Sequence, residues 1–168
     1  MITFQQARQI AESKIKDVQL ADQDTLTIIE DLTIEKEYAW IFQYTSSRFL
    51  ETEDLSFAIA GNSPLFITKF SGQLFTYRTG LTIEQMIDQF EEDNKIWNLS
   101  IRDNALSDTS KLKFIKHICK LTIADIANLK SERIIGIGAR QKLLDIQNQL
   151  ISKNIKTDLY LATISTQT

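Results

Sequence analysis

The stretch "IAGNSPLFITKFSGQLFTYRT" (residues 59–79) predicts the centre of the fold, a β-hairpin. Its two apolar runs have strand composition, and Ser71-Gly72 between them is typical of a tight hairpin turn. Gly61 can adopt a positive φ, and Pro64, which has no backbone N–H, belongs at the start of a strand. The Gly-Asn-Ser-Pro segment therefore indicates a stiff entry into the first strand. A role of this turn in recognition is the alternative.

Two more strands are expected before the hairpin, "TLTIIEDLTIE" (residues 25–35) and "YAWIFQYTS" (residues 38–46). Both are rich in the β-branched and aromatic residues that favour strands. Trp40, Phe42 and Tyr44 alternate onto one face of the second strand. We expect these three aromatic side chains to lie in the core. An exposed aromatic binding stripe is the alternative.

One helix is predicted before these strands in the sequence and one after them. Thr3 and Gln6 fit a capping box at the start of the first helix, and Thr82 and Gln85 fit one at the start of the second. Residues 1–95 therefore predict an α+β domain, in which an antiparallel sheet of about four strands is flanked by two helices.

Residues 96–168 predict a second, smaller domain after a boundary at "EEDNK" (residues 91–95). Strand patterns occur in "IWNLSIRD", "RIIGIG" and "IKTDLYLATIS". Helical patterns start near Ser107 or Asp108, at Thr122 and in "ARQKLLDIQNQLISKN". The expected order is β-α-α-β-α-β.

The charges divide unequally between these two parts. The formal net charge is −3, but residues 1–95 hold sixteen acidic and eight basic residues, whereas residues 96–168 hold six and eleven. This asymmetry indicates two electrostatic roles. Attraction between the two halves is the alternative.

The sequence offers no catalytic constellation, so we expect neither an enzyme nor a metal or cofactor. Cys119 and His117 are the only cysteine and histidine, which excludes an internal disulfide and a site with several such ligands. "IIGIGAR" lacks the spacing of a phosphate-binding loop and indicates a structural turn rather than a phosphate cradle. Lys113, Lys116 and Lys120 form a basic helical stripe that could contact phosphates or simply face solvent.

A cytoplasmic location is expected. The chain has no apolar run of the roughly 18 residues that a membrane span needs, and its start lacks the basic and apolar regions of a signal peptide.

Several motifs of residues 1–95 occur in the order typical of one family: "ITFQQARQIAESKI", a Trp-x-Phe strand, "FLETED", "GNSP", a strand before Gly72, and a last helix after Thr79. Together they resemble the immunity protein 35 family, which includes YrhB-like proteins. The matching positions are Trp40, Phe42, Phe49, Leu50, Glu51, Thr52, Asp54, Gly61, Asn62, Pro64, Gly72 and Thr79. Glu53 stands where a glycine is common in the family. Residues 96–165 resemble the C-terminal domain of the bacterial ribosomal stalk protein, with "KLTIA" in place of its glycine-containing segment.

The first resemblance implies a non-enzymatic immunity protein that binds and neutralises a cognate polymorphic toxin in the producing cell, by stoichiometric occlusion. The acidic first domain suggests a basic, nucleic-acid-targeting toxin as the partner. The residues expected to bind this partner are Arg48, Glu51, Glu53, Asp54, Glu91, Glu92 and Asp93. A chaperone-like or adaptor protein is one alternative, and a ribosome- or RNA-associated module acting through the basic second domain is another.

Overall fold

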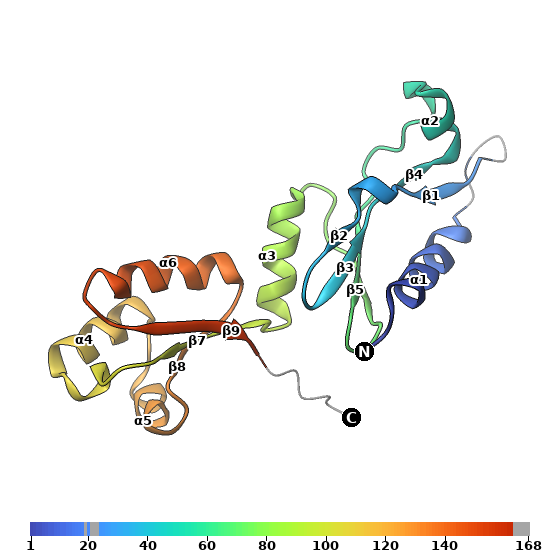
Figure 1. Ribbon diagram of the computed structural model, residues 1–168. Helices are drawn as coiled ribbons and strands as arrows, with labels where there is room; N and C mark the ends of the chain where they lie inside the picture. The colour runs from blue at the N-terminus through green and yellow to red at the C-terminus, as the bar shows by residue number, and fades with distance from the viewer. Residues whose placement is uncertain (19, 21–23, 163–168) are drawn as a thin grey trace. The chain divides into compact units, whose positions relative to one another are not determined.

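The computed structural model describes residues 1–18, 20 and 24–162, in two compact units, Met1–Met86 and Ile87–Thr168 (Figure 1). The division between the units falls within helix α3 (Ile83–Asp93). Both units combine helices with antiparallel sheets, so the predicted α+β class is confirmed. In the described part of the chain, no helix has the length and apolar character that a membrane span requires.

The first unit is built on a four-stranded antiparallel sheet in the order β2-β3-β5-β6. Its strands are β2 (Ile34–Glu35), β3 (Ala39–Phe42), β5 (Leu65–Thr68) and β6 (Leu74–Phe75). In the β5–β6 hairpin, Phe66 lies opposite Phe75, and Gly72 takes a φ of 71° in the connecting turn. The predicted hairpin and its glycine turn are therefore confirmed.

Helix α1 (Phe4–Lys16) covers one face of this sheet (Figure 1). The predicted capping box is present, since the Gln6 N–H donates to Thr3 Oγ1 at 3.2 Å and the Thr3 N–H donates to Gln6 Oε1 at 2.8 Å. The helix buries Ala7, Ala11 and Ile15. Two alanines on the buried face leave room for large side chains of the sheet.

Those large side chains are aromatic. Trp40 and Phe42 are buried, and the Phe4 ring contacts both of them, with centroid distances of 6.1 and 5.8 Å. Tyr44 packs against the same core with part of its surface exposed. The prediction that these alternating aromatics form a core face is thus confirmed.

The chain also forms a separate two-stranded sheet from β1 (Leu26–Ile28) and β4 (Tyr44–Ser46). The single strand expected over residues 25–35 is therefore two strands with the 3-10 helix η2 (Glu30–Leu32) between them. The register explains the difference. Ile28 lies opposite Tyr44 and Ile34 lies opposite Ile41. The chain from Ile28 to Ile34 therefore has three more residues than the chain from Ile41 to Tyr44 with which it pairs. One 3-10 turn, η2, accommodates the three extra residues.

The second unit contains an antiparallel sheet in the order β8-β7-β9. Its strands are β7 (Trp97–Ile101), β8 (Ile134–Gly138) and β9 (Thr157–Leu161). The short η4 (Ala105–Ser107) and the helices α4 (Thr109–Ile118), α5 (Ile123–Glu132) and α6 (Arg140–Ile151) complete the predicted β-α-α-β-α-β order. Asp108 and Thr122 cap α4 and α5.

The core of the second unit lies between this sheet and its helices. Its fully buried side chains include Leu99 of β7, Ile115 of α4, and Leu143 and Leu150 of α6. Cys119, at the end of α4, packs against the same core, and burial raises the pKa of its thiol to about 11. At neutral pH this cysteine is therefore a protonated, apolar packing residue.

Candidate interaction site

The segment after β4 carries two exposed leucines of the first unit, Leu50 and Leu55. It consists of helix α2 (Ser47–Thr52), the connecting residues Glu53 and Asp54, and the 3-10 helix η3 (Leu55–Phe57), and we call it the α2–η3 segment. Neither α2 nor η3 contains a buried residue. In Figure 1, α2 lies at the end of β4, away from the four-stranded sheet.

Local sequence signals define both ends of this segment. Ser46 caps α2 by accepting the Phe49 N–H at 3.1 Å. Glu53 ends the helix with a φ of 56°, in the left-handed region. The Asp54 carboxylate then accepts the Ser56 N–H at 2.9 Å and begins η3, and this backbone bond is the main cause of its lowered pKa. The segment is therefore a defined turn with a fixed shape.

Asp24 anchors the segment to β1 and β4. Its carboxylate accepts hydrogen bonds from the Ser46 hydroxyl, from the Thr25 N–H at 2.7 Å and from the Arg48 N–H at 3.3 Å. The Ser46 hydroxyl is the largest cause of the lowered pKa of Asp24, and the two backbone N–H groups lower it further. The sequence interpretation missed this residue, although an aspartate facing a helix start is a favourable electrostatic arrangement.

Replacing Asp24 with alanine is expected to loosen the start of α2, because three donors lose their shared acceptor. The Arg48 and Phe49 amides should exchange several-fold faster with deuterium, and Asp31→Ala, at an exposed aspartate of η2, should leave them unchanged. Since folding lowers the pKa of Asp24 below its ordinary 3.8, its stabilising effect is complete above that value and is lost as the pH falls through the folded pKa. Protection factors of the α2 amides, corrected for the intrinsic pH dependence of exchange, that change with neither the substitution nor acid would contradict this role.

The outer surface of the α2–η3 segment combines two leucines with three acids. Leu55 is 80% exposed and Leu50 is 46% exposed. Glu51, Glu53 and Asp54, which lie between the two leucines in the chain, are also exposed. Sequence reasoning selected the acids and missed Leu55, because a lone leucine in a connection does not show from sequence which way it points. The segment therefore presents apolar and acidic side chains to solvent within one short stretch of chain.

Arg48, the basic residue among those predicted to bind a partner, has a contact within the segment. Its guanidinium lies 5.4 Å from the centroid of the Phe57 ring, and this cation–π contact joins α2 to η3. Thr52 adds a second internal contact by donating to the Arg48 carbonyl at 2.7 Å. In the structure, Arg48 therefore holds the two helical turns together.

The other three predicted residues lie at the end of α3. Glu91 is only 3% exposed and accepts the Arg140 N–H at 2.6 Å. Glu92 forms an ion pair with Lys142 and accepts the Ala139 N–H at 2.9 Å; the Lys142 bond, followed by the Ala139 bond, lowers its pKa. The two carboxylates thus cap the N-terminus of α6, whose own N-cap, Ala139, makes no side-chain cap bond. Asp93 is exposed.

The Gly-Asn-Ser-Pro turn borders a cavity of about 310 Å³ in the first unit. Its Asn62 side-chain amide donates to the Tyr44 carbonyl, and Pro64 directly precedes β5. Tyr44, Thr79 and Met86 also line the cavity. Among the described residues, those that line the cavity carry no charged side chain.

Comparisons with known proteins agree on the first unit. A family model described as immunity protein 35 matches residues 5–89, about half of the chain. The uncharacterized protein YrhB of Escherichia coli (strain K12) is 30% identical over 70 residues, which cover 42% of this chain and 74% of YrhB. No solved structure matches the chain, and the expected likeness of residues 96–165 to the ribosomal stalk protein is not shown. The chain belongs to the immunity protein 35 family.

Proposed function

We propose that this protein neutralises a cognate polymorphic toxin by forming a one-to-one complex through the α2–η3 segment. The complex would form in the cytoplasm of the producing cell and occlude the active site or another essential surface of the toxin. Family membership supports a non-catalytic inhibitor of a toxin. The exposure of Leu50, of Leu55 and of the three acids between them in the chain is the observation that carries the choice of surface.

The chemistry of this surface favours a basic partner. A buried apolar contact supplies most of the affinity in many protein interfaces, and charged groups at the border govern the association rate and the choice of partner. Leu55 and Leu50 would supply the apolar contact, and Glu51 and Glu53 would face cationic residues around the toxin's binding site. Toxins that act on nucleic acids carry such cations, so we propose this class.

The experiment is co-expression with the toxin encoded by the neighbouring gene, followed by co-purification and measurement of the complex mass. We expect a one-to-one complex and rescue of growth. Failure of the two proteins to bind at micromolar concentrations, together with failure to rescue growth, would overturn the proposed function. Suppression of aggregation of unrelated proteins without a defined toxin complex would instead indicate a chaperone.

Leu55→Ser is expected to weaken toxin binding by about tenfold to a hundredfold, because the most exposed apolar side chain of the α2–η3 segment is lost. Binding would be measured by titration calorimetry. Leu32→Ser is the matched control, since Leu32 is 47% exposed in η2, outside the α2–η3 segment. The Leu32→Ser variant should bind the toxin with the affinity of the original protein. Equal affinities of the two variants would place the interface elsewhere.

A further inference from the structure

Strand β9 has an open edge in the second unit. Among the strands of the described residues, the sheet order places only β7 beside β9. The Arg102 N–H donates to the Lys156 carbonyl at 2.9 Å, and the Ala162 N–H donates to the Ile96 carbonyl at 2.8 Å. Because bonding direction alternates along an antiparallel strand, the backbone groups of Thr157, Leu159 and Leu161 point away from β7.

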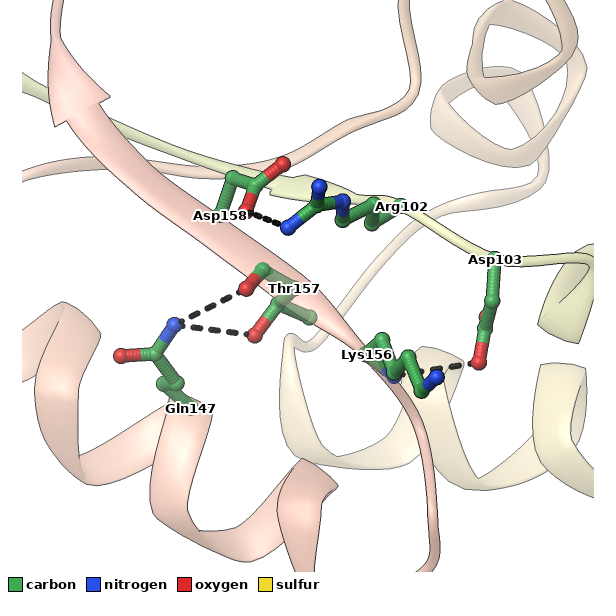
Figure 2. Close-up of polar contacts among 6 residues, drawn as sticks. All are labelled: Arg102, Asp103, Gln147, Lys156, Thr157 and Asp158. Atoms are coloured by element: carbon green, nitrogen blue, oxygen red, sulfur yellow. Dashed lines mark hydrogen bonds and ion pairs between the residues drawn. The ribbon is translucent and has the colours of Figure 1, made fainter.

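Within the described residues, only some of these outward-pointing backbone N–H and C=O groups have a hydrogen-bond partner. Figure 2 shows Gln147 of α6 donating from Nε2 to the Thr157 carbonyl, at 3.3 Å, and to Thr157 Oγ1, at 3.1 Å. No described strand pairs with the same edge at Leu159 or Leu161. Proteins usually protect such edges with lysine, proline or a bulge, yet "TDLYL" contains neither residue and its pairing with β7 is regular.

The start of the strand is also held in place. The Lys156 N–H donates to Asp103 Oδ2 at 3.1 Å, and Arg102 Nη1 lies 3.5 Å from Asp158 Oδ1 (Figure 2). The edge is therefore ordered before any partner arrives, which lowers the entropic cost of pairing.

The other sheet edges among the described residues are less suited to pairing with an added strand. β2 and β6 have two residues each. The pairing of β8 with β7 contains an irregularity between Leu99 and Ser100, and Gly138 at its end has a φ of 135°. β9 is the longest regular edge among the described strands of the two larger sheets.

We propose that β9 pairs antiparallel with β9 of a second copy of this chain, with the two Leu159 residues opposite each other on a two-fold axis. In this register Asp158 lies opposite the partner's Tyr160, and Thr157 lies opposite the partner's Leu161. No like charges face each other in this register. The backbone N–H and C=O of Leu159 would hydrogen-bond to the C=O and N–H of Leu159 in the second copy. The two three-stranded sheets become one sheet of six strands.

Exposed apolar side chains next to the edge support a second copy as the occupant. Ile151 is 56% exposed and lies one turn beyond Gln147 on the side of α6 that reaches β9. Tyr160, on β9 itself, is 40% exposed. The two-fold pairing brings the two α6 helices side by side, so that each covers the Ile151 side of the other.

Tyr160→Asp is expected to raise the dimer dissociation constant by about tenfold or more, because it places two carboxylates opposite each other at two symmetric positions. The measurement is sedimentation velocity of the full chain at about 10–100 μM, the range in which a small edge interface is populated. The original protein should be dimeric in this range. Circular dichroism would confirm that the variant remains folded.

Two further variants test the register. Tyr160→Asn introduces a side chain of the same size as aspartate without the charge, and it should weaken the dimer much less than Tyr160→Asp. The double variant Asp158→Lys/Tyr160→Asp should dimerise more tightly than Tyr160→Asp because opposite charges now face each other. A monomeric original protein, or equal weakening by Asp and Asn, would overturn the proposal. A requirement for Tyr160 in toxin binding by a monomer would assign the edge to the toxin instead. The proposal does not depend on the α2–η3 segment, so its failure leaves the proposed function intact.

Discussion

Replacing Gly138 with alanine is expected to lower the free energy of unfolding of the second unit by about 2–4 kcal/mol. Gly138 has a φ of 135°, which residues with a side chain rarely adopt. A Cβ at this position would lie 2.1 Å from Glu92 Oε2 and 2.8 Å from Glu92 Cδ. Glu92 cannot move away without losing its bonds to the Ala139 N–H and Lys142. Backbone strain and loss of the α6 cap therefore add together.

Urea unfolding followed by Trp97 fluorescence, with Trp40 replaced by phenylalanine in every variant, would measure this effect in the second unit. Gly80→Ala is the control, because no heavy atom lies within 4 Å of a Cβ built at Gly80 and its φ is not positive. It should change stability by less than about 0.5 kcal/mol. A similarly small effect at Gly138 would show that Glu92 is not essential to the cap.

Replacing Phe42 with alanine is expected to destabilise the first unit by about 3–5 kcal/mol. Phe42 is fully buried on β3 and contacts the Phe4 ring of α1. The smaller side chain leaves a cavity between helix and sheet. We propose that residues 1–95 and 96–168 fold as separate domains, so hydrogen exchange should accelerate in the first and not in the second.

Phe70→Ala is the matched control for this substitution, since Phe70 is 37% exposed next to the hairpin turn. It removes the same atoms with a much smaller loss of stability. Acceleration of exchange throughout the chain in Phe42→Ala would instead show that the two domains unfold as one cooperative unit.

The sequence predicted those parts of the fold that are set by neighbouring residues. Thr3 and Gln6 lie three positions apart, as a capping box requires, and Trp40 and Phe42 alternate as one face of a strand requires. The break at η2 was not predictable in this way. It depends on the registers of two sheets, and residues 25–35 alone do not show that their partner has three fewer residues.

The candidate site was predicted less well for the same reason. The acids of the α2–η3 segment were identified from composition, but Asp24 acts on residues 22 to 24 positions later in the chain. Glu91 and Glu92 form an acidic run that normally faces solvent, yet they bond the chain 49 and 47 residues later. The one local signal was Ala139, a poor N-cap at the start of α6, which indicates that a cap comes from elsewhere.

The absence of buried residues from α2 and η3 has a consequence for how this protein can evolve. Substitutions at exposed positions usually change folding free energy by less than about 0.5 kcal/mol. Leu50, Glu51 and Leu55 can therefore vary with little effect on the core, while Asp24 and Ser46 keep the segment in place. With this segment as the proposed interface, a lineage facing an altered toxin could change its specificity one residue at a time without passing through unfolded intermediates.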